Sequence, residues 1–232
     1  MTSTRPLLVA EVFGPTVQGE GPSAGRRCGF VRLGGCNLDC VWCDTPYTWD
    51  WTRFRPRQEL SHVTCGDLVR QVTAMDVDMV VVTGGEPMLQ QDRLLPFLTA
   101  VNARGWRVEV ETNGTIAPSA GVVALVDQFN VSPKLANSAV APDERLVDSS
   151  LATYARCGRA VFKFVVEEVA DIDEVDTVVA RHGLRPVYLM PQATDAAGVV
   201  AGMRRVAEAT AERGYSLSPR LHILLWGNAR GR

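Results

Sequence analysis

Three cysteines lie within eight residues of one another in the segment GCNLDCVWC, at Cys36, Cys40 and Cys43. Cysteine thiolates are the usual ligands of iron–sulfur clusters, and three of them can hold three corners of a 4Fe-4S cube. No fourth cysteine follows at short spacing, so one iron would stay open to an exogenous ligand. The C-x3-C-x2-C spacing differs from the bacterial ferredoxin run and lacks the paired C-x2-C arms of most zinc sites.

Two other uses of these cysteines remain open at this point. A zinc site could be completed by Cys28, Cys65 or His62, because tetrahedral sulfur ligation suits zinc as well as iron. Partial disulfide bonding is the other alternative. It is disfavoured because the chain of 232 residues has only six cysteines and shows no secretory leader.

Composition is that of an ordinary globular protein, with 46% hydrophobic and 22% charged residues. A net charge of −2 leaves no electrostatic footprint for nucleic acid or for an anionic membrane. The apolar run near the N-terminus, residues 7–10, is too short for a signal peptide or a membrane span. We therefore expect a cytoplasmic protein with one domain over residues 1–232 and a cluster loop at 36–43.

Strand-like and helix-like segments alternate along the chain. The expected strands are apolar and rich in β-branched residues, as strands buried on both faces are, at residues 30–33, 79–83, 107–111, 129–132, 161–166, 187–190 and 221–226. The expected helices cover residues 64–75, 92–103, 144–157, 172–182 and 197–213. This alternation predicts an α/β fold, an incomplete TIM-like βα barrel of about six parallel strands plus a C-terminal strand.

Polar and glycine-containing motifs follow several of these strands directly. They are TGGEP at 83–87, ETNG at 111–114, SPK at 132–134 and MPQ at 190–192. A GGEP motif alone is more often an ordinary turn than a site. In parallel α/β folds, however, ligands bind where the carboxyl ends of the strands meet, and paired glycines let a backbone approach a ligand closely. The motifs therefore predict one binding site that the cysteine loop also borders.

The cysteine spacing after a first strand, followed by GGEP after the second, resembles the radical S-adenosylmethionine (SAM) superfamily. The resemblance implies that the open iron binds the amino and carboxylate groups of SAM, whose reductive cleavage gives methionine and a 5′-deoxyadenosyl radical. It also implies the radical SAM core fold and a set of SAM-binding residues, namely Trp42, Cys43, Asp44, Gly84, Gly85, Glu86, Ser132, Pro133, Lys134, Met190, Pro191 and Gln192.

The N-terminal third narrows the resemblance. VQGEGP at 17–22, FVR at 30–32, GCNL at 35–38 and WCDT at 42–45 are similar to motifs of the 7-carboxy-7-deazaguanine synthase family. That family implies a Mg2+-dependent lyase that contracts 6-carboxy-5,6,7,8-tetrahydropterin to 7-carboxy-7-deazaguanine plus ammonia. The product serves the biosynthesis of queuosine or of deazapurine natural products. A homodimer and a flavodoxin- or ferredoxin-type reductant are further expectations from the family.

Residues that would meet the pterin follow from the same resemblance, at Val17, Gln18, Gly19, Glu20, Arg32, Thr83 and His222. Amide, backbone and carboxylate groups at Gln18–Glu20 suit the guanine-like edge of a pterin, and a bidentate arginine suits its carboxylate. Thr45 would bind Mg2+, which prefers oxygen ligands. Taken alone, Arg32 reads as a strand-edge arginine, Thr45 as a turn residue and His222 as a structural histidine.

Some features depart from the family pattern or leave alternatives. Some members end in a terminal carboxylate at the active site, whereas here residues 226–232 run on beyond His222, so that contact is not expected. The segment 47–59 reads as a solvated loop rather than a lid. Alternative functions are a radical enzyme of activase type, a single-cluster electron-transfer protein and a zinc-binding structural module.

Overall fold

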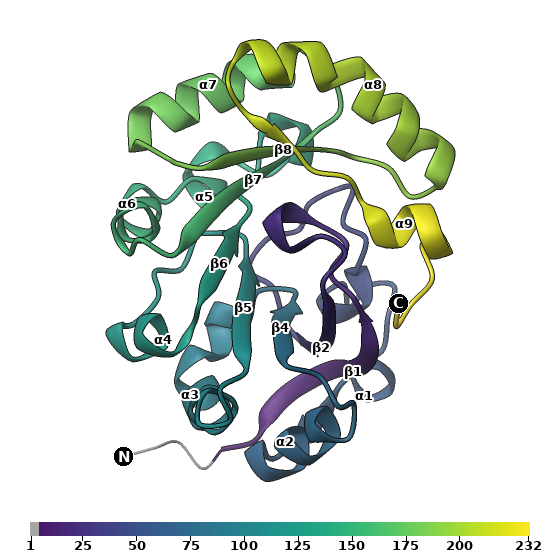
Figure 1. The fold of residues 1–232 in the computed structure, drawn as a ribbon, viewed down its shortest axis with the longest axis vertical. Helices are drawn as coiled ribbons and strands as arrows, with labels where there is room; N and C mark the ends of the chain where they lie inside the picture. Colours follow the sequence, from purple (N-terminus) through teal and green to yellow (C-terminus); the bar gives the residue numbers. More distant parts are fainter. Residues whose placement is uncertain (1–4) are drawn as a thin grey trace.

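The computed structural model describes residues 5–232, which form an α/β fold around one open, curved sheet (Figure 1). Its nine strands lie in the order β3-β1-β2-β4-β5-β6-β7-β8-β9. Strand β2 and strands β4 to β9 pair in parallel, whereas β1 pairs antiparallel with both β2 and β3. Because β3 and β9 remain edges, the sheet does not close, which confirms the predicted incomplete barrel.

All six predicted parallel strands are present, together with the antiparallel strands β1 and β3 and the short parallel strand β9. The bounds are β1 Leu7–Val17, β2 Arg27–Leu33, β3 Ser61–Val63, β4 Met79–Gly84, β5 Arg107–Thr112, β6 Gln128–Val131, β7 Ala160–Val166, β8 Val187–Pro191 and β9 Ser216–Leu217.

The helices lie mostly on the outer, convex side of the sheet, whereas the short helix α9 lies at its open edge (Figure 1). Their bounds are α1 Pro56–Glu59, α2 Cys65–Thr73, α3 Gln91–Asn102, α4 Ala120–Leu125, α5 Pro142–Arg145, α6 Asp148–Arg156, α7 Asp171–His182, α8 Ala196–Glu212 and α9 Leu221–Trp226. Caps define several starts, since the side chains of Thr64, Ser119 and Asp195 each accept a backbone N–H bond from the first turn.

Side chains on each parallel strand alternate between two very different environments. The outward ones, such as Val80 and Val82 on β4, join the main core beneath the helices. The inward ones, such as Met79 and Val81, form a small core inside the barrel with Cys28 and Phe30. One step further along the inner face, nearer the carboxyl end of the sheet, the inward side chains become polar.

The pairing of neighbouring strands then fixes which polar side chains are neighbours. Arg32 follows Cys28 and Phe30 on the inner face of β2, and it lies directly opposite Thr83 of β4. Glu111 of β5 is paired in the same way with Asn130 of β6. The interior is therefore apolar at its base and polar at the carboxyl ends of the strands.

One predicted strand is wrong. Residues 221–226 form helix α9, and the short strand β9 before it occupies the sheet edge. In this segment only Ile223 is fully buried, while Leu225 and Trp226 are exposed. A short apolar run cannot be assigned to strand or helix by its pattern alone, and this one does not have the burial of a central strand.

Other boundaries also differ from the sequence-based expectation. The predicted helix 144–157 is two helices, α5 and α6, separated by two residues. Strand β1 was not predicted, because a register shift around Gly14 and Pro15 interrupts its pattern. The segment 47–59 is not a plain loop, since it contains part of a 3-10 helix at Pro46–Thr48 and helix α1.

Within residues 5–232, we find no helix with the length and hydropathy that crossing a membrane requires.

Two valines of α8 test the assignment of its buried face. Val206 is fully buried in the main core, whereas Val200 is 40% exposed on the same helix. We expect Val206→Ala to lower the free energy of unfolding by about 2 kcal/mol, because two core methyl groups are lost. Val200→Ala is the matched control and should change it by less than about 0.5 kcal/mol. Equal effects in urea unfolding would contradict the packing of α8.

Candidate active site

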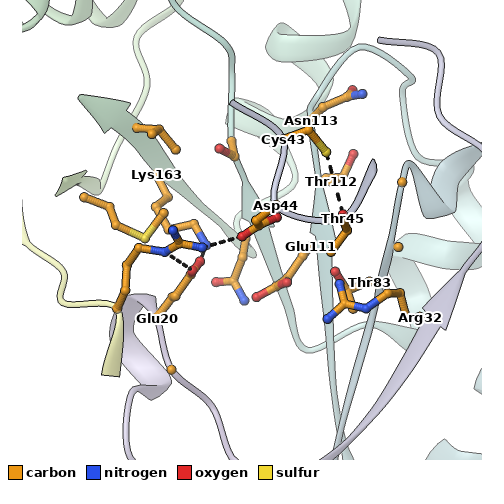
Figure 2. A pocket seen from close by; sticks show the side chains of 18 of the residues that line it. Glu20, Arg32, Cys43, Asp44, Thr45, Thr83, Glu111, Thr112, Asn113 and Lys163 are labelled. Carbon is orange, nitrogen blue, oxygen red and sulfur yellow. Dashed lines mark hydrogen bonds and ion pairs between the residues drawn. The ribbon is translucent and has the colours of Figure 1, made fainter. Parts of the chain in front are cut away.

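A cavity of about 210 Å3 opens at the carboxyl ends of the parallel strands. It collects most of the predicted site residues, namely Cys36, Cys40, Cys43, Trp42, Asp44, Thr45, Gly84, Gly85, Ser132, Lys134, Met190, Gln192, Val17, Gln18, Gly19, Glu20, Arg32, Thr83 and His222. Figure 2 shows part of the cavity lining, with Glu20 and Lys163 on one side and Arg32 and Thr83 on the other.

Three predicted residues do not line the cavity: Glu86, Pro133 and Pro191. The alternation of side chains along β8 explains why Pro191 does not line the cavity. Pro191 points outward, as Leu189 does, and packs against α8, where a Cβ on Gly202 would lie 2.6 Å from it. Its neighbours Met190 and Gln192 do line the cavity. In the same way Ser132 and Lys134 line it while Pro133 between them does not.

The cysteine loop follows β2 and forms one wall of the cavity. Cys36, Cys40 and Cys43 are free thiols that pack on one small apolar cluster with Leu38 and Val140. The structure therefore contradicts the disulfide alternative for these cysteines. Burial raises the pKa of Cys36 to about 12, so its thiol holds its proton until a metal displaces it.

Hydrogen-bond donors are directed at two of the three sulfur atoms. The backbone N–H of Leu38 donates to Cys36 Sγ at 3.4 Å, and Trp49 Nε1 donates to Cys43 Sγ at 3.3 Å. Such bonds to the sulfurs are one way in which proteins tune iron–sulfur clusters. The donor set and its surroundings therefore fit a cluster held by three thiolates.

Among residues 5–232, no group of three or more His, Cys, Asp or Glu side chains converges on a site for a single metal ion. In a cubane cluster each thiolate binds a different iron atom, so its sulfur ligands need not converge on one point. The absence of such a convergence among the described residues is therefore compatible with a cluster held by Cys36, Cys40 and Cys43.

Gly84 and Gly85 bring β4 against the cysteine loop. A Cβ on Gly85 would lie 2.2 Å from the carbonyl oxygen of Gly35, and a Cβ on Gly84 would lie 2.3 Å from that of Leu33. Gly84 also has a φ of +153°, which side chains rarely adopt. Both positions require glycine, and the exposed backbone becomes part of the cavity wall.

Glu86 fixes the turn after these glycines from behind. It is fully buried, and its carboxylate accepts hydrogen bonds from Met88 N at 2.9 Å, Thr112 Oγ1 at 2.9 Å and Asn113 N at 2.7 Å. The desolvation of this carboxyl raises its pKa to about 6. Its side chain thus ties β4 to the end of β5 rather than facing a ligand.

The opposite wall is a network of buried charges. Glu20 pairs with Lys163 of β7 and, at 3.3 Å, with Arg220 Nε, while Arg220 Nη2 also donates to Asp44 beside the last cysteine. Although desolvation opposes its ionisation, the cations Lys163 and Arg220 hold the pKa of Glu20 well below its usual range. Figure 2 shows this connection between the QGEG motif and the cysteine loop.

His222 packs directly on Gly19. A Cβ at Gly19 would lie 2.0 Å from His222 Nδ1, and the backbone N–H of Leu221 donates to Gly19 O at 2.8 Å. Burial lowers the pKa of His222, so its imidazole is neutral at neutral pH. Its Nε2 lies 3.9 Å from Glu20.

Arg32 and Thr45 occupy the third wall (Figure 2). Arg32 Nε donates to Glu11 Oε2 at 3.0 Å, and Glu11 also accepts from Tyr47. Although desolvation opposes it, the pKa of Arg32 is raised by Tyr47, Asp44 and Glu11, so the guanidinium stays charged. The Thr45 hydroxyl lies 3.8 Å from Cys43 Sγ, between Arg32 and the cysteine loop.

Sequence reasoning missed several side chains that line the cavity, chiefly Glu111, Asn130, Lys163 and Arg220. Arg232 also lines it, so the last residue reaches the cavity, contrary to the expectation for residues 226–232. Lys163 had a signal, because it is the one charged residue in the apolar run VFKFVV. Glu111 had a weaker one, as it begins a motif at a strand end. Arg220 had none, because its place depends on how the chain after β9 packs back against Glu20.

Comparisons with known proteins agree with this geometry. A family model described as the Radical SAM superfamily matches residues 30–138. The 7-carboxy-7-deazaguanine synthase of Pyrobaculum aerophilum is 40% identical over the whole of both chains. That of Halobacterium salinarum is 36% identical over 96% of this chain and 91% of its own.

A solved structure agrees as well. The crystal structure of QueE from Escherichia coli superposes with a TM-score of 0.72 at 26% identity, over 92% of this chain and 93% of that one. The open barrel and its three-cysteine loop define a radical SAM protein. Within that class, the chain belongs to the 7-carboxy-7-deazaguanine synthase family.

The close contact at Gly85 predicts a failure of cluster assembly. Gly85→Ala should displace the cysteine loop, because its Cβ would overlap the backbone of Gly35. We expect iron bound after anaerobic reconstitution to fall to less than about half of the wild-type value. Gly66→Ala in α2, where a Cβ meets only Arg70 at 4.0 Å, is the matched control and should load fully. Full loading of both variants would contradict the tight packing.

The Glu20 network predicts a pH-dependent stability. The folded pKa of Glu20 is depressed below its ordinary value of 4.5, so its contribution to stability is complete above that pH and is lost as the pH falls. In the protein without its cluster, the wild-type free energy of unfolding should fall more steeply than that of Glu20→Gln between about pH 5 and about pH 3.5. Urea unfolding at several pH values measures both slopes, and equal slopes would contradict the pairing.

Proposed function

We propose that this protein is a lyase that contracts the ring of 6-carboxy-5,6,7,8-tetrahydropterin to 7-carboxy-7-deazaguanine, with release of ammonia. The product is a precursor of 7-deazapurines such as queuosine. One observation carries the proposal: the three-cysteine loop, the charged side chain of Arg32 and the amide and carboxylate of the QGEG motif face a single cavity. The similarity over the full length to enzymes of that name supports it.

Cys36, Cys40 and Cys43 would hold the 4Fe-4S cluster, and SAM would bind its open iron. When bound, the reduced cluster and SAM together supply the radical that begins the rearrangement. The chain's own part is to bind and orient the cofactor between the backbone of Gly84–Gly85 and the side chains of the opposite strands. Residues suited to this role by their place in the cavity are Trp42, Asp44, Ser132, Lys134, Met190 and Gln192.

The substrate would lie against the other side of the cavity. Gln18 and Glu20 offer donors and acceptors to the pterin edge, and the neutral imidazole of His222 borders it. Arg32 would take the substrate carboxylate, since its charged fork matches two carboxylate oxygens. Thr83 is paired with Arg32 across the sheet and would contact the same part of the substrate.

Mg2+ would bind between Thr45 and the substrate. The Thr45 hydroxyl lines the cavity next to the cysteine loop and would supply one oxygen ligand, since Mg2+ commonly combines few protein ligands with substrate and water. We also propose that residues 1–232 are one domain, because the strands of the described residues 5–232 form a single sheet. The protein would be a cytoplasmic homodimer. Its electrons would come from a flavodoxin- or ferredoxin-type reductant.

The function is tested by an anaerobic assay of cluster-reconstituted protein with SAM, Mg2+, dithionite and 6-carboxytetrahydropterin, read by mass spectrometry. The proposal expects 7-carboxy-7-deazaguanine, and none when SAM is omitted. Release of 5′-deoxyadenosine without that product would reject the substrate. The absence of both from fully loaded protein would favour a single-cluster electron carrier instead.

The role of Thr45 predicts how activity depends on Mg2+. Thr45→Ala should lower the rate of product formation by about tenfold or more, because an oxygen ligand is lost. The increase of that rate with added Mg2+ should also become smaller. Thr45→Ser keeps the hydroxyl and is the matched control, with a Mg2+ dependence close to that of the wild type. Initial rates across a Mg2+ titration measure this, and an unchanged response in Thr45→Ala would remove the metal from Thr45.

A further inference from the structure

Glu11 of β1 lies between two arginines from distant parts of the chain. Its Oε2 accepts hydrogen bonds from Arg32 Nε at 3.0 Å and from Tyr47 OH at 3.1 Å, while its Oε1 pairs with Arg230. The side chain of Glu11 is only 12% exposed. One carboxylate thus shares its charge between an arginine that lines the cavity and one that does not.

The two terminal nitrogens of the Arg32 guanidinium, Nη1 and Nη2, are free to bind a ligand. Its Nε is occupied by Glu11, whereas no group of residues 5–232 accepts a hydrogen bond from its Nη1 or Nη2. Its guanidinium carbon lies 5.7 Å from the centre of the Phe13 ring, which supports the plane from one side. The two terminal nitrogens are therefore the groups that can bind a carboxylate from the cavity.

Arg230 is anchored independently of the cavity. Its Nη1 donates to Glu59 of α1 at 2.8 Å, and its guanidinium carbon lies 3.8 Å from the centre of the Tyr47 ring. These contacts hold the segment after α9 against α1 and the 3-10 helix. They also fix the position from which Arg230 balances Glu11.

We propose that Arg230 is a positioning residue that keeps Arg32 free for the substrate carboxylate by sharing the charge of Glu11. Without Arg230, Glu11 has Arg32 as its one cationic partner among the residues of the described chain. A carboxylate with two free lone-pair directions competes for the same nitrogens as the substrate, and it lowers the local positive potential. Both effects weaken carboxylate binding. The inference rests on the proposed function, which places the substrate carboxylate at Arg32.

The test is the selectivity for the carboxylate, defined as the ratio of the dissociation constants of tetrahydropterin and 6-carboxytetrahydropterin. Calorimetry on the cluster-loaded protein under anaerobic conditions gives both constants from one preparation, so loss of folded protein does not alter the ratio. Arg230→Ala should reduce the selectivity roughly fivefold, the worth of a partly exposed ion pair. Affinity for the ligand that lacks the carboxylate should not change.

Two further variants make the result specific. Arg205→Ala removes a similar exposed ion pair, with Glu168 at 2.6 Å, and should leave the selectivity unchanged. In a Glu11→Gln background, Arg230→Ala should have no further effect, because there is no charge left to share. In turnover, Arg230→Ala should raise KM while kcat stays near that of the wild type.

The inference is overturned if Arg230→Ala keeps the wild-type selectivity, or if it loses the same factor in the Glu11→Gln background. Arg32→Ala separates this outcome from failure of the proposed function. If Arg32→Ala abolishes the selectivity and Arg230→Ala does not change it, the inference alone is wrong. If Arg32→Ala has no effect, the substrate carboxylate lies elsewhere and both are wrong.

Discussion

In the parallel strands β2 and β4–β8, side chains that point outward pack beneath helices and those that point inward face the barrel interior. Two-residue periodicity therefore decides which side chains reach the cavity. Arg32, Thr83 and Lys163 reach it because they share the inward face of their strands. A shift of one residue in any pairing would direct these groups into the apolar core, where their burial would be costly.

A polar interior in a domain of this size needs partners for every buried charge. Glu20, Lys163 and Arg220 satisfy one another, and Arg220 extends the network to Asp44. Removing one member would leave an uncompensated buried charge, which is far more destabilising than the pair is stabilising. The same interactions connect the QGEG motif, the cysteine loop and the chain after β9, so the walls of the cavity are held in place before any ligand binds.

Much of this arrangement could be predicted from the sequence. The apolar runs located the six parallel strands, and the motifs at their ends located the cavity, because parallel strands bring their carboxyl ends to one edge. What failed depends on contacts between distant segments. Residues 221–226 read as a strand by composition, although β9 had already taken the edge. Arg220 and Arg230 carried no local signal, since their partners lie about two hundred residues away in the chain.

The central claim is that one cavity orients a carboxylated pterin beside a three-cysteine cluster through side chains from opposite strands. A crystal structure of the cluster-loaded protein with SAM and 6-carboxytetrahydropterin tests it most directly. The account predicts three thiolates from Cys36, Cys40 and Cys43 on the cluster and both terminal nitrogens of Arg32 on the substrate carboxylate. A substrate bound with its carboxylate away from Arg32, or a cluster held by other residues, would contradict it.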